Sequence, residues 1–98
     1  MNLENYLHSL TPKIFKVLPM YEETDHGLPV YLERLLAELR GSTFTFPDLS
    51  DNVQYITIMN NLNYLLHYEY TKEECRRLVF DSISHLGKIT GSGGVVDG

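Results

Sequence analysis

Apolar residues recur at steps of three and four along four successive segments of this chain, and no other feature restricts its fold as strongly. This spacing is typical of helices that turn one apolar face toward a core. The segments comprise residues 2–18, 28–39, 48–67 and 71–87. Because short connections make consecutive helices neighbours, the sequence predicts an all-α protein, an antiparallel four-helix bundle.

The first segment is expected to contain a break near its middle. Thr11 precedes Pro12, and this pair is typical of a cap followed by proline at the first helical position. We therefore expect a short helix that ends at about Leu10 and a new turn that starts at Pro12. Pro19 disfavours helical geometry in the residue before it, so the acidic stretch that follows is expected to be a loop.

The second segment carries signals at both of its ends. Pro29 lies in the expected first turn, where its missing N–H costs nothing, and Gly41 lies where a left-handed cap would end the helix. Residues 42–47 alternate polar and aromatic side chains but have no second strand to pair with. We expect them to form an extended connector that places Phe44 and Phe46 in the core.

The third segment has the broadest apolar face, which is typical of a helix with several neighbours. The fourth begins with a capping box, in which the Thr71 hydroxyl accepts from the Glu74 amide and the Glu74 carboxylate accepts from the Thr71 amide. This helix is expected to end near Gly87. The glycine-rich residues 91–98 lack periodicity and predict a flexible C-terminal tail after a single domain of residues 1–90.

Composition restricts the function classes open to the chain. Its 98 residues suffice for one small domain, and 43% hydrophobic with 21% charged residues is typical of a folded globular protein. The formal net charge of −5 argues against a nucleic-acid binder, which would need an excess of Lys and Arg. No apolar run approaches the roughly 20 residues that span a bilayer, so any membrane contact is expected to be peripheral.

Residue usage also points to a reducing compartment. Cys75 is the single cysteine, so no internal disulfide can form. The first ten residues lack the basic start and the apolar run of a secretion signal. We therefore expect a cytoplasmic protein that acts as a monomer.

Chemically reactive side chains do not form a recognisable site in the sequence. The four histidines are far apart, and none is paired at the i, i+4 spacing with which one helical face holds zinc. Cys75 lies near a helix start, where a thiolate is favoured, but it also belongs to the apolar stripe of that helix and is better explained as a small buried side chain. We assign no catalytic, metal-binding or cofactor-binding residue, and we expect neither enzyme activity nor a cofactor.

Tyrosines and a local group of basic residues are the strongest candidates for recognition. Seven tyrosines are many for 98 residues, and tyrosine offers a large contact area at a small entropic cost. The candidate partner-binding residues are Tyr64, Tyr68, Tyr70, Arg76, Arg77 and Lys88. A simpler explanation stays open, in which the tyrosines cover the edge of a small core and the cations are merely solvated.

Four stretches carry a resemblance to a known family. They are residues 28–39 (LPVYLERLLAEL), 60–66 (NNLNYLL), 70–78 (YTKEECRRL) and 83–90 (ISHLGKIT). Between residues 28 and 90 the chain resembles the cytoplasmic immunity proteins that protect lactic acid bacteria and streptococci from pediocin-like bacteriocins, especially the enterocin A immunity group. It differs from many members of that family in its negative net charge.

The resemblance implies a four-helix bundle with a flexible C-terminal tail and no enzyme activity. It implies that the protein binds the membrane receptor of the bacteriocin, a sugar-transporting mannose phosphotransferase permease, from the cytoplasmic face once the bacteriocin has engaged it. In that family the C-terminal half governs which bacteriocin is resisted, which here corresponds to the third and fourth segments and residues 90–98. The alternative hypothesis is a small helical adaptor or inhibitor of phage or plasmid origin that binds one cytosolic protein.

Overall fold

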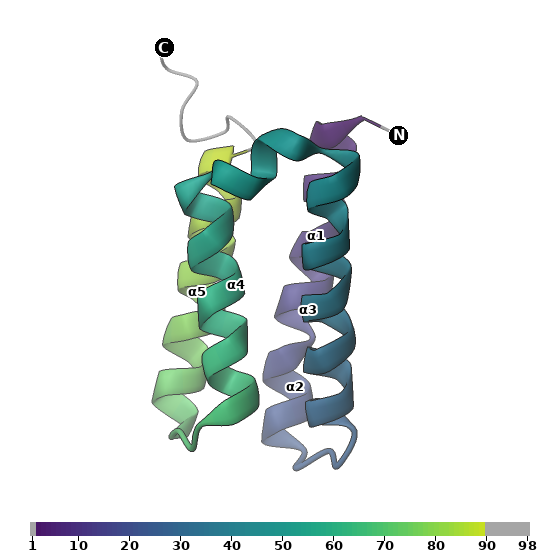
Figure 1. Ribbon diagram of the computed structural model, residues 1–98. Helices are drawn as coiled ribbons and strands as arrows, with labels where there is room; N and C mark the ends of the chain where they lie inside the picture. Colours follow the sequence, from purple (N-terminus) through teal and green to yellow (C-terminus); the bar gives the residue numbers. More distant parts are fainter. Residues whose placement is uncertain (1, 90–98) are drawn as a thin grey trace.

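The computed structural model describes residues 2–89, and its regular elements within that range are all helical. They are α1 (Leu3–Phe15), α2 (Val17–Glu22), α3 (Leu28–Thr45), the 3₁₀ helix η1 (Pro47–Asp51), α4 (Val53–His67) and α5 (Lys72–Ile89). α1 and α2 form one arm antiparallel to α3, and α4 runs antiparallel to α5 (Figure 1). The predicted all-α four-helix bundle is thus confirmed, while the predicted tail, residues 91–98, lies outside the described residues. None of the helices within residues 2–89 combines the length and hydrophobicity needed to cross a membrane.

α1 continues through Pro12, where the sequence predicted a break. Its N-cap is Asn2, whose side-chain oxygen accepts a hydrogen bond from the Asn5 amide at 2.7 Å. Pro12 lacks the N–H that would bond to the carbonyl four residues earlier, but its ring is exposed to solvent. The buried side chains on this arm extend across the proline and are Tyr6, Leu7, Leu10, Ile14 and Val17. The prediction was wrong because burial of this continuous stripe outweighs one lost hydrogen bond.

The interruption in this arm lies at Lys16 instead, and Pro19 accounts for it. Pro19 has no N–H to offer the Phe15 carbonyl, so the hydrogen-bond ladder is interrupted one turn before the proline. Lys16 keeps helical backbone angles of φ −61° and ψ −21°, and α2 continues to Glu22. The predicted loop therefore begins after Glu22, later than expected.

α3 continues through Gly41 to Thr45, well past its predicted end at Leu39. Ser42 explains the continuation, because it falls on the core side one turn after Leu39 and is buried there. Its hydroxyl donates to the Leu39 carbonyl at 2.7 Å. Gly41 is consequently a residue within a helix and not a left-handed cap.

The predicted extended connector does not form. Phe44, which was expected in the core, lies on the last turn of α3 and is 87% exposed, because the continued helix turns it outward. Phe46 does pack inward, and its ring stacks on Tyr6 of α1 with centroids 5.7 Å apart. η1 then connects α3 to α4, contacts both, and buries Leu49.

α4 begins at Val53 rather than at the predicted residue 48. The side chain of Asn52 caps it by accepting a hydrogen bond from the Tyr55 amide at 3.0 Å. As its broad apolar face predicted, α4 has several neighbours, since it packs on α3, α5 and η1.

The capping box at the start of α5 is confirmed. The Thr71 amide donates to Glu74 Oε1 at 2.9 Å, and the Glu74 amide donates to the Thr71 hydroxyl at 3.1 Å. α5 runs to Ile89, slightly past its predicted end, and packs on α1, α2 and α4.

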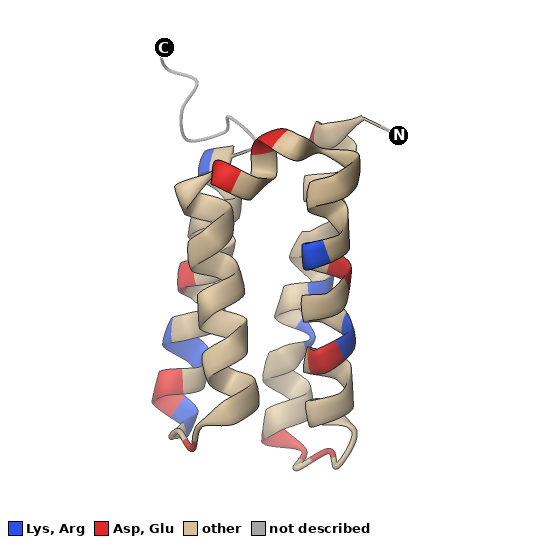
Figure 2. Ribbon diagram, in the orientation of Figure 1, with Lys and Arg blue, Asp and Glu red and all other residues tan. Residues whose placement is uncertain are grey.

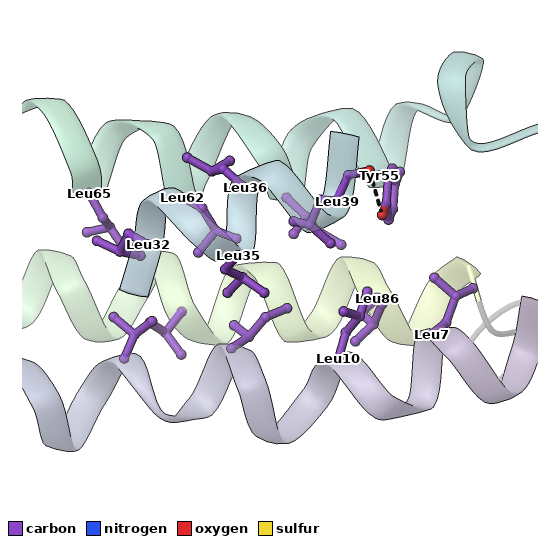
Figure 3. Packing of buried hydrophobic residues seen from close by; sticks show 14 of the residues in the cluster. Leu7, Leu10, Leu32, Leu35, Leu36, Leu39, Tyr55, Leu62, Leu65 and Leu86 are labelled. Atoms are coloured by element: carbon purple, nitrogen blue, oxygen red, sulfur yellow. Dashed lines mark hydrogen bonds between the residues drawn. The ribbon is translucent and has the colours of Figure 1, made fainter. Parts of the chain in front are cut away.

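The core is a leucine-rich cluster to which every helix contributes (Figure 3). Tyr55 is the largest fully buried side chain, and its hydroxyl lies beside the Ser42 hydroxyl and 3.1 Å from the Leu39 carbonyl. These partners satisfy a polar group that would otherwise destabilise an apolar interior. Burial raises the pKa of Tyr55, so its hydroxyl stays protonated and available as a donor.

Candidate partner-binding surface

α4 is a surface helix without a charged side chain. Its fifteen residues, Val53–His67, include no Asp, Glu, Lys or Arg. In Figure 2 the helix is accordingly tan along its length, without red or blue. The outer face of a bundle helix normally carries charges, because it faces water. An uncharged outer face is instead typical of the centre of a protein–protein interface, from which charged residues are depleted.

The exposed side chains of α4 form one stripe, which we call the α4 face. Its members are Val53, Ile56, Asn60, Tyr64, His67 and the C-cap residue Tyr68. At 100° per residue these positions lie within about 120° of one another around the helix axis. Val53 is 71% exposed and Tyr68 is 62% exposed, so large apolar groups meet solvent at both ends of the stripe.

Tyr64 and Tyr68 form a stacked pair at one end of the α4 face. Their ring centroids are 4.9 Å apart with an interplanar angle of 20°. The Tyr68 amide donates to the Tyr64 carbonyl at 3.0 Å, which ties the second ring to the end of the helix. Two large rings held in this way offer a rigid contact surface, because little side-chain entropy remains to be lost on binding.

The structure places Tyr70 in the packing rather than on this face. Its ring lies 5.2 Å from that of Tyr21 on α2, and its carbonyl accepts a hydrogen bond from the Tyr21 hydroxyl at 3.2 Å. Burial, aided by the neighbouring Cys75, raises the pKa of Tyr70 to about 12. Of the three tyrosines singled out from the sequence, two therefore lie together on the surface and one joins the α4–α5 turn to α2.

Two of the basic candidates on α5, Arg76 and Lys88, lie apart from the tyrosine pair. Arg76, Arg77 and Lys88 are all exposed, but Lys88 lies in the last turn of α5, about 18 Å along the axis from Arg76. Arg76 is one turn before Phe80, whose ring packs edge-on against Phe15 of α1. Arg76 is thus on the side of α5 that faces α1, away from α4, and the six sequence candidates do not form one surface.

Polar side chains fix how α4 lies on α5. The Asn61 amide donates to Asp81 Oδ2 at 2.9 Å and to the Ser82 hydroxyl at 3.1 Å. His85 is 3.3 Å from Asp81 through Nε2 and contacts the Gln54 side chain through Nδ1. Because hydrogen bonds are directional, this arrangement holds the rotation of α4 and keeps the α4 face turned outward.

Sequence reasoning missed Val53 and Ile56. Both are apolar residues of the third segment, whose broad apolar face was expected to contact neighbouring helices, whereas they are 71% and 37% exposed. The sequence did contain a signal for them, because a fifteen-residue surface helix without Asp, Glu, Lys or Arg is itself an indication of an interface.

Cys75 is fully buried, as the sequence interpretation favoured. Burial, with a smaller contribution from Glu22, raises the pKa of its thiol to about 11, so only a trace of thiolate exists at neutral pH. Within residues 2–89 no group of three or more His, Cys, Asp and Glu side chains is arranged to hold a metal ion.

Among the described residues, the α4 face is therefore the candidate for a recognition surface. Comparison of the chain with protein-family models, with curated protein sequences and with solved structures finds no significant match.

Proposed function

We propose that this protein is a bacteriocin immunity protein that acts by binding another protein. In this proposal it works in the cytoplasm and recognises the sugar-permease receptor of a pediocin-like bacteriocin once the bacteriocin has engaged it. The observation that carries the proposal is the uncharged, aromatic-ended α4 face, which belongs to the part of the chain that resembles the immunity family.

The α4 face suits such a partner for physical reasons. A fifteen-residue helix is about 22 Å long, which is enough for the central strip of a modest interface. Tyrosine is enriched among residues whose truncation costs about 2 kcal/mol or more of binding energy, so the Tyr64–Tyr68 pair is the expected anchor. Val53 and Ile56 would exclude water along the rest of the strip without a charge to desolvate.

Protection in cells tests this proposal. The chain is expressed in a sensitive lactic acid bacterium, and survival is measured against a panel of pediocin-like bacteriocins. We expect raised tolerance to at least one of them. The double variant Tyr64→Ser, Tyr68→Ser is expected to lose that protection while keeping the circular dichroism spectrum of the parent.

A matched variant separates loss of the surface from loss of an aromatic side chain. Phe44→Ser also removes an exposed ring, 87% exposed, but from α3. It is expected to protect as well as the parent. Equal loss in both variants, or none in either, would refute the assignment of the α4 face.

The α4 face would suit an unrelated protein partner equally well, so the alternative hypothesis is a helical adaptor or inhibitor that binds one cytosolic protein. Unchanged killing by the entire panel, with the protein shown to be folded and abundant, would refute the immunity proposal. The conclusion would then be a helical adaptor or inhibitor that uses the same face on a cytosolic protein.

A further inference from the structure

A second feature of the molecule is a groove between α1 and α3. It has a volume of about 510 Å³, within the range of sites that hold small ligands or peptide side chains. Pro12 and Lys13 come from α1, Lys16 from the interruption after it, and Tyr31 and Arg34 from α3. None of these residues belongs to the α4 face.

Polar contacts hold the two walls of the groove in place. Lys13 Nζ lies 2.9 Å and 3.1 Å from the two carboxylate oxygens of Glu38, which also accepts from the Tyr6 hydroxyl at 3.3 Å. The Tyr31 hydroxyl donates to the Lys13 carbonyl at 2.6 Å. Because α1 and α3 are tied by long side chains, the space between them is built into the fold and a ligand need not open it.

The groove also gathers positive charge in an acidic protein. The chain has 8 Lys and Arg residues and a net charge of −5, yet Lys13, Lys16 and Arg34 all line this one groove. Lys13 is neutralised by Glu38. Within residues 2–89 Lys16 and Arg34 have no carboxylate partner, and Lys16 Nζ lies 5.4 Å from the centre of the Tyr31 ring.

We propose that this groove binds an acidic segment of a protein partner, in which carboxylates adjoin an apolar side chain. Arg34 and Lys16 pair with the carboxylates, and the planar guanidinium accepts them in the two-pronged geometry that carboxylates favour. Tyr31, Leu35 and Pro12 supply the surface for the apolar side chain. The groove and its ligand are independent of the α4 face and of the immunity proposal.

Two other anions fit these walls less well. A bare phosphate would gain nothing from the apolar part of the groove, which an acidic peptide covers. An anionic membrane is an extended negative surface, and it would be repelled by the rest of a chain with net charge −5, whereas a peptide within the groove meets mainly the local cations. The local charge and the apolar lining together favour the peptide.

The test is a titration of the whole isotope-labelled chain, followed by amide NMR shifts. The probe is N-acetyl-leucylglutamate, which carries two carboxylates beside one leucine side chain, and its uncharged match is N-acetyl-leucylglutamine amide. We expect saturating shifts confined to the groove with a Kd on the order of 1 mM, inside the ceiling for a ligand of this size. The uncharged dipeptide is expected to cause no saturating shift.

Charge-matched variants identify the cations responsible. Lys16→Gln with Arg34→Gln should weaken binding about tenfold, because the ion pairs of two exposed cations are lost. Arg40→Gln with Lys88→Gln removes the same net charge from exposed positions outside the groove and should leave the Kd unchanged.

Four outcomes would overturn the proposal. They are shifts scattered over the surface, equal weakening in both double variants, shifts from inorganic phosphate equal to those from the dipeptide, and binding to phosphatidylglycerol vesicles without binding of the dipeptide. The third would identify a bare anion site, and the fourth a membrane-contact surface.

Discussion

Replacement of Gly41 by alanine tests the largest difference between the predicted and the observed course of the chain. In the structure Gly41 is an exposed residue within the helix α3. A Cβ atom added at this position would have no other atom within 4 Å. Alanine in a helix is more stable than glycine by about 0.5–1 kcal/mol, because glycine loses more backbone entropy on folding. Gly41→Ala should therefore raise the free energy of unfolding by that amount.

The sign of the change decides between the two conformations. Had Gly41 been the left-handed cap that the sequence predicted, a Cβ would have cost about 1 kcal/mol or more at that position. For a domain of this size the expected gain corresponds to a rise in Tm of about 2–8 °C. Urea and thermal unfolding, each followed by far-UV circular dichroism, measure it directly.

Gly27 offers the matched control. A Cβ there would lie 3.1 Å from Asp25 Oδ1, the atom that accepts a hydrogen bond from the Gly27 amide at 2.7 Å. Gly27→Ala should thus bring no gain. A lower free energy of unfolding in Gly41→Ala than in the parent would refute the continuous helix, and a gain in Gly27→Ala as large as that in Gly41→Ala would refute the explanation by helical backbone entropy.

Three further predictions concern the core. The native state keeps a proton on Cys75, whose pKa is about 11, while the unfolded chain loses it above about pH 9, so the free energy of unfolding should fall by roughly 1–2 kcal/mol as the pH rises from 9 to 11. Urea titrations across this range check it, and Cys75→Ala should lose that part of the slope. Leu62→Ala should destabilise by about 2–5 kcal/mol, because Leu62 is fully buried, and a loss below 1 kcal/mol in urea unfolding would contradict its place in the core. Tyr55→Phe should lower the free energy of unfolding by only about 1 kcal/mol in the same assay, because Ser42 and the Leu39 carbonyl keep their own hydrogen bond. A loss above about 3 kcal/mol would show that the Tyr55 hydroxyl has stabilising contacts besides Ser42 and the Leu39 carbonyl.

Local signals in the sequence sufficed where the interacting groups are close along the chain. The capping box of Thr71 and Glu74 was predicted correctly, because it depends on three residues of spacing and not on the rest of the fold. Pro12 and Gly41 misled for the opposite reason. Each disfavours helix locally, glycine by about 1 kcal/mol and proline by about 3 kcal/mol, and burial of side chains against helices distant in the sequence outweighed this preference.

The candidate partner-binding residues likewise divide into those whose position follows from local spacing and those whose position depends on tertiary packing. Tyr64 and Tyr68 are four residues apart, so their pairing at the end of a helix was readable from spacing. That Tyr70 packs on Tyr21, and that Arg76 turns toward α1, depends on how α5 is rotated against its neighbours. Helical periodicity does not specify that rotation between separate helices.

The sequence by itself determined the helical class, the approximate number of arms and the residues able to bury a common face, because apolar periodicity and capping act over a few residues. Only the tertiary structure decided where helices continue through unfavourable residues, which apolar side chains of α4 stay outside, and how Lys16 and Arg34 come to share one groove. Those outcomes depend on the packing of segments far apart in the chain, and the energy that selects them exists only once the arms are assembled.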